Sequence, residues 1–474
     1  MPDLAKAPDE ALAVDTHGAT AAVISKLKDR FQDRCATSPA LRQQHGHTTT
    51  WLENQPPDAV VFAESTQEVA DVVRLCAEHK VPVIPFGAGS SLEGHLNAPF
   101  GGISIDLSRM NAVLEVNDQD LDSRVQAGVT RKQLNSYIRD TGLFFPIDPG
   151  ADATVGGMAA TRASGTNAVR YGTMKDAVLG LTVVTADGRI IKTGGRARKS
   201  SAGYDLTRLY VGSEGTLGVI TELTLRLHGQ PEAISGGICT FPDIAAACNA
   251  VITTIQMGLP VARIELLDAM QIRACNTYSK LDLAETPTLF LEFHGSEAGV
   301  REQSETFSEI AGEFGGGPFK WATPAEDRTR LWAARHDAYW AGKTLNPEAD
   351  IMVTDVCVPI SRLADCVAET AEDIRTEGFL APIVGHVGDG NFHVQILVNL
   401  DDAEERRRTE AFVGRLALRA IDMGGTCTGE HGVGQGKQKY MAHEHGEALD
   451  VMRSLKRALD PDNIMNPGKI LPQS

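Results

Sequence analysis

The chain has 474 residues, more than a single simple core usually holds, which predicts two or three domains. Its formal net charge of −17 argues against a nucleic-acid partner, because phosphate binding requires clustered Lys and Arg. The hydrophobic share of 42% is typical of a globular protein, and no apolar run reaches the roughly 18 residues that span a bilayer.

The N-terminal residues and the cysteines predict a cytoplasmic protein. Residues 1–18 are acidic and lack an apolar stretch, unlike a secretory signal or a basic transit peptide. The eight cysteines include no C-x-x-C pair, and scattered thiols are typical of a reducing compartment.

The first part of the chain alternates strands with helices. Residues 1–54 are polar and are predicted to be helical, and a strand at 59–63 follows. Ser65–Glu68 forms a capping box that predicts the start of a helix. The next strand, 81–86, leads into a glycine-rich loop at 87–94, and another strand follows that loop.

The later part of the chain has a different pattern. Residues 103–228 contain short strands separated by glycines, whereas longer helices and strands alternate from 230 to about 430. The predicted helices there are 242–258, 296–314, 324–344 and 360–378. The predicted strands are 260–268, 287–295, 350–359 and 381–400. This alternation predicts an α+β domain whose sheet is covered on one face by helices.

The loop 87–94, GAGSSLEG, resembles a nucleotide-binding loop only in its glycines. Its third glycine comes too late for G-x-G-x-x-G, and no Gly-Lys-Ser/Thr follows. Strands on both sides also argue against a dinucleotide fold, in which a helix N-terminus meets the phosphates. Two readings remain: a loop whose backbone N–H groups surround an anion, or an irregular turn.

Two further glycine-rich segments follow, at 146–173 and 212–221. In the first, Asp152 or Thr154 can cap a short helix that begins at Val155, and small residues there allow a ligand to approach closely. Three such segments within about 130 residues indicate one extended, phosphate-bearing ligand held by several loops.

In sequence and order, the three segments resemble the flavin-binding domain of the vanillyl-alcohol oxidase superfamily. Some relatives attach FAD through a histidine where this chain has Gly89-Ser90, so the resemblance implies noncovalent FAD. His95 lies beyond that position and is expected to be a surface residue. The residues implied to bind FAD are Pro85, Gly87, Ala88, Gly89, Ser90, Ser91, Gly94, Pro149, Gly150, Asp152, Thr154, Gly156, Gly157, Ala160, Ser164, Gly165, Asn167, Ala168, Tyr171, Gly172, Glu214, Gly218, Val219, Ile220 and Asn466.

The segment 385–393, GHVGDGNFH, places two histidines around Asp389-Gly390. Asp-Gly is a strong signal for a two-residue hairpin turn. With that turn, His386 lies directly opposite His393, with Cβ atoms about 4.5–5.5 Å apart on one face. Two imidazoles so placed can bind one cation, although stacked surface histidines are the alternative.

A second segment, 425–437, supplies Glu430 and His431 between glycines. Two histidines and one carboxylate suit Zn²⁺, Mn²⁺ or Fe²⁺ acting as a Lewis acid. Upstream, the predicted helix 324–344 carries Arg335 and Tyr339 one turn apart on one face. A guanidinium fixed among small apolar neighbours suits a substrate carboxylate, and a solvated helix charge is the alternative.

Five segments together resemble the FAD-linked D-lactate dehydrogenases that use a cytochrome acceptor, and their relatives acting on D-2-hydroxyglutarate and glycolate. These segments are RHDAYWA, TDVCVPISRL, GHVGDGNFH, GTCTGEHGVGQGK and NIMNPGKIL. The resemblance implies a divalent metal, Zn or Mn, bound by His386, His393 and Glu430. It also implies that His431 is the base and that Arg335 binds the substrate carboxylate. The resemblance places Tyr339 among the catalytic residues too, although similar lactate enzymes tend to have Trp at this position.

The resemblance implies an α+β fold with a two-part FAD-binding domain and an α+β cap domain, in which helices cover an antiparallel sheet. The expected division is an N-terminal segment (1–54), the FAD domain (55–229), the cap (230–438) and a returning tail (439–474). The expected partners are a small 2-hydroxy acid and a separate electron acceptor, which is a cytochrome, a quinone or an electron-transfer flavoprotein. A homodimer and peripheral attachment to a membrane through the acceptor are further expectations.

The predicted reaction is the oxidation of a D-2-hydroxy acid to the 2-oxo acid. D-Lactate is preferred over D-2-hydroxyglutarate because the strand 350–359 carries no basic residue for a second carboxylate. Two other classes remain open: a metal-dependent hydrolase that uses the two histidines, Glu430 and a water, and a non-catalytic nucleotide-binding module.

Overall fold

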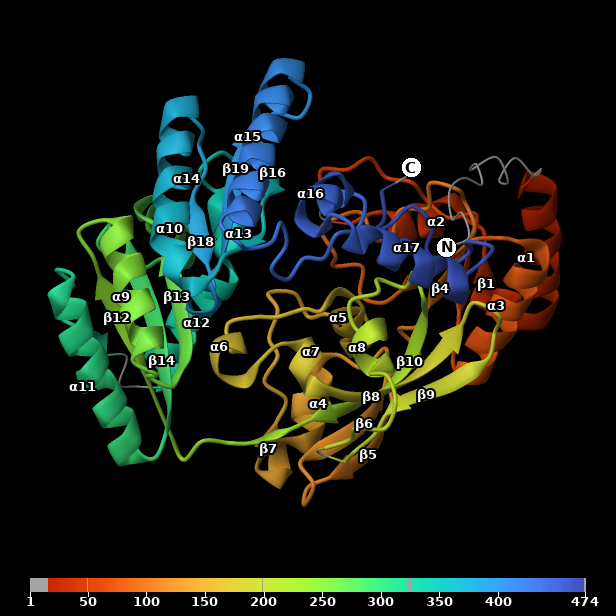
Figure 1. Cartoon of the computed structure of the whole chain (residues 1–474), viewed down its shortest axis with the longest axis horizontal. Helices are drawn as coiled ribbons and strands as arrows, with labels where there is room; N and C mark the ends of the chain where they lie inside the picture. Colours follow the sequence, from red (N-terminus) through yellow and green to blue (C-terminus); the bar gives the residue numbers. More distant parts are fainter. Residues whose placement is uncertain (1–15, 49, 198, 322–324, 473–474) are drawn as a thin grey trace.

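A computed structural model describes residues 16–48, 50–197, 199–321 and 325–472. The chain forms two lobes, and each has its own large hydrophobic core. The first lobe holds a four-stranded and a five-stranded sheet, and the second holds an eight-stranded sheet (Figure 1). Among the described residues, no helix has the length and apolar character needed to cross a bilayer.

The four-stranded sheet of the first lobe follows the predicted βα order. Its strands, in spatial order, are β1 (Cys35–Ala36), β2 (Ala59–Phe62), β4 (Ile103–Asp106) and β3 (Val83–Phe86), of which the last three are parallel. Helix α3 (Thr66–His79) begins as predicted, because the side chain of Ser65 accepts a hydrogen bond from the Glu68 N–H. The N-terminal segment contains helices α1 (Thr16–Phe31) and α2 (Pro39–Gly46), but it is not helical throughout, because strand β1 lies between them and no helix is present at 47–48 or 50–54. Residues 1–15 and 49 of this segment lie outside the described residues.

The five-stranded sheet is antiparallel throughout. Its strands, in spatial order, are β5 (Val113–Asn117), β6 (Asp122–Gln126), β10 (Gly218–Arg226), β8 (Val178–Thr185) and β9 (Ile190–Gly194). The short helices around it are α4 (Arg131–Ile138), α5 (Val155–Thr161), α6 (Ala168–Tyr171), α7 (Met174–Ala177) and α8 (Leu206–Tyr210), and β7 (Leu143–Phe144) pairs with β11 (His228–Gly229).

The sheet of the second lobe is also antiparallel in every pairing. In spatial order it contains β15 (Lys320–Trp321), β12 (Ala233–Thr240), β14 (Thr288–Gly295), β13 (Val261–Leu267), β18 (Ile383–Gly385), β19 (Asn391–Val398) and β16 (Asp350–Val353), and β17 (Val356–Cys357) pairs with β19. One face packs against α9 (Ile244–Gln256), α11 (Glu297–Glu313), α14 (Leu363–Glu377) and α15 (Ala403–Asp422).

Helices cover the other face of this sheet too, so the prediction of a single covered face is wrong. Side chains alternate along a strand, and in β14 Leu289, Leu291 and Phe293 enter the large core while Phe290 points to the opposite side. There Phe290 meets a smaller core formed with α10 (Ala269–Ser279), α12 (Ala325–His336) and α13 (Ala338–Lys343).

Two predicted elements are interrupted. The helix predicted at 324–344 divides at Asp337 into α12 and α13, and the strand predicted at 350–359 divides at Thr354-Asp355 into β16 and β17. Both breaks lie beside the cavity described below.

The C-terminal part of the chain returns to the first lobe (Figure 1). Helices α16 (Met441–His445) and α17 (Ala448–Leu459) precede a tail in which Met465 forms a parallel bridge with Val83. Ile464 and Met465 are buried in the core of the first lobe. The first lobe is therefore formed by two separate parts of the chain, and the second lobe is formed by the residues between them.

Candidate active site

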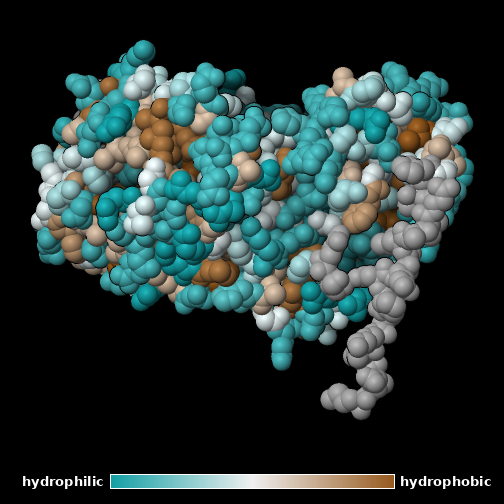
Figure 2. Space-filling view, turned by 90° about the horizontal axis from the view of Figure 1, so that it is seen from above, coloured by the Kyte–Doolittle hydropathy of each residue, from teal (hydrophilic) through white to brown (hydrophobic). Residues whose placement is uncertain are grey.

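A cavity of about 420 Å³ is lined by residues of both lobes. Its size lies in the range of small-molecule and cofactor sites. The face in Figure 2 is mostly hydrophilic and is notched between the lobes. Six residues predicted for catalysis or metal binding line this cavity, and they are Arg335, Tyr339, His386, His393, Glu430 and His431.

Many of the residues predicted to bind FAD line the same cavity. These are Pro85, Gly87, Ala88, Gly89, Ser90, Ser91, Pro149, Gly150, Thr154, Gly156, Gly157, Ala160, Glu214, Gly218, Ile220 and Asn466. The structure places the others outside its lining: Gly94, Asp152, Ser164, Gly165, Asn167, Ala168, Tyr171, Gly172 and Val219.

Two of the residues outside the lining, Gly165 and Asn167, contact Asp148, which does line the cavity and which the sequence did not indicate. The Asn167 N–H donates to Asp148 Oδ1 at 3.0 Å, and the Thr166 hydroxyl donates to Oδ2 at 2.7 Å. A Cβ on Gly165 would lie 2.5 Å from the Asp148 carbonyl. Tyr171 instead bonds to His294 of the second lobe at 2.8 Å. The second glycine segment therefore acts partly as a support for its neighbours.

The first-lobe side of the cavity is shaped by residues with little or no side chain. A Cβ on Gly87 would lie 2.3 Å from the Thr154 Oγ1, and a Cβ on Gly156 would lie 2.6 Å from the Ala127 Cβ. The Ser91 Oγ and the Asn466 Oδ1 are buried and lack a hydrogen-bond partner, although both residues line the cavity. We call this first-lobe part of the lining, which includes Gly87, Ser91, Gly156 and Asn466, the cradle. Its narrow shape and unsatisfied polar atoms fit an extended polar ligand such as FAD.

His95 is buried, so the prediction of a surface histidine is wrong. Only 4% of the residue is exposed, and its Nε2 lies 3.3 Å from the Glu214 Oε2. It also lines the cavity. A histidine in a loop without periodicity gives no sequence signal for this burial, because the partner carboxylate lies far along the chain.

His386, His393 and Glu430 form one cluster. The Nε2 atoms of His386 and His393 lie 3.1 Å and 3.4 Å from the Glu430 Oε1. The opposite ring nitrogens are held from behind: His386 Nδ1 lies 2.9 Å from the Glu265 Oε1, and His393 Nδ1 lies 3.1 Å from the Thr354 carbonyl oxygen. Metal-binding histidines are usually held in this way, by a carboxylate or a carbonyl on the second nitrogen.

The predicted hairpin register is wrong, although the two histidines do meet. His393 pairs with Val384, not with His386, and His386 precedes a 3₁₀ turn at Val387–Asp389. A two-residue type I′ turn requires positive φ at both central residues, and only Gly390 has it here, at +79°. The imidazole rings still lie 5.5 Å apart, centroid to centroid. The longer turn leaves His386 diagonal to His393, on the same side of the sheet.

The charges of this cluster favour a cation. Burial acts to raise the pKa of Glu430, but His386 holds it well below its ordinary value. Burial acts to lower the pKa of His386, but Glu265 and Glu430 raise it well above its ordinary value. Glu430 Oε2 is buried without a hydrogen-bond partner. Two buried carboxylates therefore stabilise positive charge between them, and a metal ion fits that requirement.

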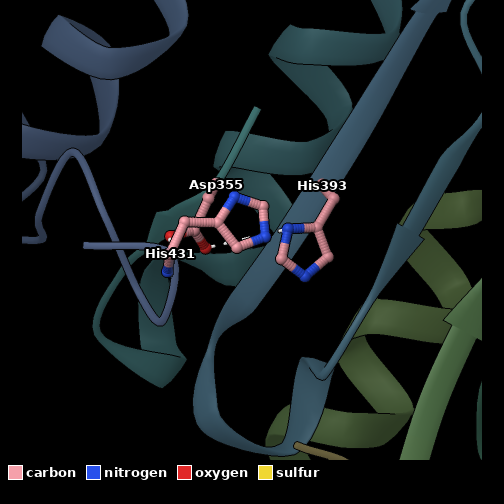
Figure 3. A group of neighbouring side chains, drawn as sticks. All are labelled: Asp355, His393 and His431. Atoms are coloured by element: carbon pink, nitrogen blue, oxygen red, sulfur yellow. Dashed lines mark hydrogen bonds and ion pairs between the residues drawn. The ribbon is translucent and has the colours of Figure 1, made fainter. Parts of the chain in front are cut away.

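Asp355, His393 and His431 form a second close group, drawn in Figure 3. Asp355 already accepts hydrogen bonds from the backbone N–H groups of Glu430 and His431, each at 2.9 Å, and from the Thr428 hydroxyl at 2.7 Å. A carboxylate with so many donors is a poor candidate for a further metal bond. We interpret Asp355, which the sequence did not indicate, as the residue that shapes the segment carrying Glu430 and His431.

The His431 ring lies parallel to the ring of His393, with centroids 5.1 Å apart (Figure 3). Its Nδ1 has no hydrogen-bond partner. Burial lowers the pKa of His431 to about 4, although the Asp355 carboxylate acts to raise it. The imidazole is therefore neutral near pH 7 and able to accept a proton.

Arg335 is buried, and it is ion-paired on one side. Its Nε donates to the Glu265 Oε2 at 2.8 Å, and its Nη2 lies 2.6 Å from the same oxygen. Glu265 therefore links Arg335 to His386, a partner that the sequence did not reveal. Tyr339 lines the cavity as well, and burial raises the pKa of its hydroxyl.

The turn that carries His386 touches the first lobe. A Cβ on Gly388 would lie 2.6 Å from the Ile264 Cγ2 and 2.8 Å from the Val169 Cγ2. Ile264 belongs to β13, whereas Val169 belongs to α6 of the first lobe. The turn therefore packs between the two lobes at a position where only glycine fits.

Comparison with known proteins assigns the chain to a family. Residues 57–194 match the FAD binding domain family, and residues 230–470 match the family of FAD linked oxidases, C-terminal domain. The chain belongs to the FAD-linked oxidase family. It is accordingly an FAD-dependent oxidoreductase, as predicted.

Curated relatives cover nearly the whole chain. A protein named probable D-lactate dehydrogenase, mitochondrial, from Danio rerio is 50% identical over 95% of this chain and 91% of its own length. The D-lactate dehydrogenase (cytochrome), mitochondrial, of Arabidopsis thaliana is 45% identical over 95% of this chain and 80% of its own. The resemblance to this group of FAD-linked dehydrogenases is thereby confirmed.

Solved structures confirm the predicted fold class. The 4-ethylphenol oxidase of Gulosibacter chungangensis superimposes with a TM-score of 0.77 over 99% of both chains at 19% identity. Identity this low shows a shared fold alone. The two-part FAD-binding domain and the α+β cap domain were both predicted correctly.

The prediction of a cytoplasmic location is wrong. The relatives from Danio rerio and Arabidopsis thaliana are both named as mitochondrial proteins. The prediction used the scattered thiols as a sign of a reducing compartment, and all eight cysteines are indeed free. That property is not limited to the cytoplasm.

Proposed function

We propose that the protein oxidises a D-2-hydroxy acid, with D-lactate as the substrate, to the 2-oxo acid, and that its FAD is noncovalent. The observation that carries the proposal is the sharing of one cavity: the glycine-rich cradle faces Arg335, His431 and the histidine–carboxylate cluster. The names of the curated relatives from Danio rerio and Arabidopsis thaliana support D-lactate as the substrate.

Two groups bound by the protein would supply chemistry that side chains lack. FAD, held by the glycine-rich lining around Gly87 and Gly156, would supply the acceptor for the hydride of the substrate C2. A divalent cation, which we propose to be Zn²⁺ or Mn²⁺ held by His386, His393 and Glu430, lowers the pKa of the substrate hydroxyl when bound.

The remaining roles belong to the side chains of this chain. The Arg335 guanidinium binds the substrate carboxylate and orients the acid, because Glu265 fixes the side chain in one position. The neutral imidazole of His431 takes the proton of the substrate hydroxyl. The proposed metal assists this transfer by making the hydroxyl more acidic.

The cavity supports a monocarboxylate substrate. Among the described residues that line it, Arg335 is the only arginine or lysine. A second substrate carboxylate would lack such a partner, and burying an unpaired charge is costly. We expect initial rates on D-lactate to exceed those on D-2-hydroxyglutarate and glycolate at equal concentration. A clear preference for the dicarboxylate would contradict this choice of substrate.

His431→Ala tests the reaction itself. The variant should retain FAD, but anaerobic bleaching of the flavin by D-lactate should slow by about 10²–10⁴, the usual contribution of a general base. His443→Ala, which removes an exposed histidine, is the matched control and should bleach normally. Normal bleaching in His431→Ala would refute the role of the base, and a wild-type flavin that D-lactate does not bleach would refute the substrate.

We further propose that reduced FAD passes its electrons to a cytochrome, because the Arabidopsis thaliana relative is named for that acceptor. Reduction of a quinone or an electron-transfer flavoprotein in place of a cytochrome would contradict this proposal. The homodimer and the domain boundaries at residues 54, 229 and 438 stay predictions, which sedimentation and limited proteolysis would check.

A further inference from the structure

Residues 429–437, here called the base segment, cross from one lobe to the other. At the start of the segment, the second-lobe residue Asp355 accepts the N–H groups of Glu430 and His431. The end of the segment is held by the first lobe: the Gln435 N–H donates to the Glu93 carbonyl at 2.7 Å. Glu430 and His431, which are proposed for metal binding and proton transfer, therefore lie on a segment that is hydrogen-bonded to both lobes.

On the first-lobe side, the base segment donates two hydrogen bonds to the carboxylate of Glu214. Its Oε1 accepts the Val433 N–H at 2.7 Å, and its Oε2 accepts the Gly434 N–H at 2.8 Å. Only 3% of the side chain is exposed, and the His95 Nε2 lies 3.3 Å away. Hydrogen bonds to a buried charged acceptor are stronger than those between neutral groups. Glu214 is therefore a clamp on two consecutive backbone amides.

The base segment lies so close to the first lobe that glycine is needed at the contacts. A Cβ on Gly432 would lie 2.7 Å from the Glu214 Oε1 and from the His95 Nε2. A Cβ on Gly434 would lie 2.0 Å from the Glu93 carbonyl oxygen. The segment and the two glycine-rich loops of the first lobe thus have little freedom to move relative to one another.

Glu214 also belongs to the glycine-rich cradle that lines the cavity. Glu214, His95 and Asn466 all line it, and the Asn466 side-chain amide donates to the backbone carbonyls of Glu214 at 2.7 Å and of His95 at 3.1 Å. Glu214 itself adopts a left-handed backbone with φ of +53°, which non-glycine residues rarely adopt. An unfavourable conformation is retained where the surroundings demand it.

We propose that Glu214 is a positioning residue that couples the FAD cradle to the base segment, so that Glu430 and His431 reach their places only against a correctly formed cradle. The positions of the two residues follow from the geometry alone, whereas their chemical roles rest on the proposed function. A residue that merely contributes to stability would affect the whole protein. A positioning residue affects the base segment selectively.

Hydrogen exchange in the FAD-bound protein tests the coupling directly. In Glu214→Gln, one side-chain oxygen can still accept, but the amide NH₂ then faces the second backbone N–H. Exchange of the Val433 and Gly434 amides should accelerate at least about tenfold, with β10 and α14 unchanged. Glu222→Gln is the matched control, because Glu222 lies on β10 and pairs with Arg124, away from the segment, and it should leave Val433 and Gly434 unchanged.

The rate of flavin reduction gives a second readout. At saturating D-lactate, Glu214→Gln should reduce its flavin at least about tenfold more slowly than wild type, with a smaller change in KM. Glu214→Asp keeps the charge but shortens its reach, and it should fall between the two. If Glu214→Gln does not retain FAD, the Asp variant provides the same exchange comparison.

The two proposals fail in different ways. Unchanged exchange at Val433 and Gly434, or equal acceleration in β10 and α14, would overturn the positioning role of Glu214. Failure of D-lactate to bleach the wild-type flavin would overturn the proposed substrate and leave the exchange measurement as the test of Glu214.

Discussion

The first-lobe side of the cavity is rich in glycine, alanine and serine, whereas four histidines, Arg335 and Glu430 are concentrated on the second-lobe side. On the first side the shape comes from glycines packed closely against their neighbours, as Gly87 is against the Thr154 side chain and Gly156 is against Ala127. On the second side Glu265 and Glu430 compensate the charges of Arg335 and His386. The structure of the first-lobe side thus depends on the absence of side-chain atoms at its glycines. The structure of the second-lobe side depends on paired charges.

The two sides should be sensitive to different substitutions. The glycine-rich side should fail when atoms are added, because close-packed backbone cannot yield. The charged side should fail when a charge is removed, because the remaining partner is then buried without compensation. A substitution on one side should leave ligand binding on the other side intact. Glu214 is the exception, because its carboxylate connects the two sides.

The largest effect is expected on the charged side. Glu430→Gln removes the carboxylate shared by His386 and His393, and it should weaken metal binding by more than about a hundredfold, since loss of a mere supporting residue costs 10–100-fold. Flavin reduction should fall with it while FAD stays bound. Metal analysis and the flavin spectrum check both points. Glu410→Gln, outside the cavity lining, is the control, and loss of FAD in Glu430→Gln would contradict the separation of the two sides.

A smaller effect is expected from adding one methyl group to the other side. Gly156→Ala places a Cβ 2.6 Å from the Ala127 Cβ and 2.9 Å from its carbonyl oxygen. Overpacking of this kind costs about 1–3 kcal/mol, so FAD affinity should fall while metal binding is unchanged. FAD titration by fluorescence checks the result. Gly195→Ala adds its methyl to open space and should behave as wild type.

A third effect, on the stability of the fold and not on ligand binding, concerns a charge on the glycine-rich side. Burial acts to raise the pKa of Asp148, but His336 and Arg263 lower it to about 2. Because the folded pKa lies below the ordinary 3.8, the carboxylate stabilises the fold by about 2 kcal/mol above pH 4, and this contribution is lost as pH falls from about 4 towards 2.

Asp148→Asn should therefore lower the unfolding free energy at pH 6 by about 2 kcal/mol, and the difference from wild type should shrink towards pH 3. Denaturant unfolding at both pH values measures it. Asp401→Asn, at an exposed position, provides the baseline. A difference that is independent of pH would show that Asp148 acts through its hydrogen bonds and not through its charge.

Much of the fold was predictable from local patterns. The capping box at Ser65–Glu68 begins α3, and Thr154 caps α5 with its hydroxyl, as expected. The division of the long predicted helix at Asp337 was not predictable, because residues on both sides of it have good helical character. The break is imposed by packing, since α12 and α13 must both meet α10 and the sheet.

The site residues were predictable where several of them lie close together in the sequence. The residues His386, His393, Glu430 and His431 were recognised because glycines and histidines are concentrated around them. Glu265 and Asp355 were missed because each lies in an apolar strand region and acquires its partner only on folding. Sequence spacing thus identifies residues that touch a ligand more readily than residues that hold them from behind.

Gly388 lies where the two lobes meet. The turn that bears His386 contacts the first lobe through a backbone with no side chain, and Val169 fills the space where a Cβ would be. The His386 turn and the first lobe are therefore in direct contact at this position. A hydride transfer tolerates little change in donor–acceptor distance. On the proposed function, a side chain at position 388 would therefore change the distance between the bound acid and the flavin, although Gly388 does not line the cavity.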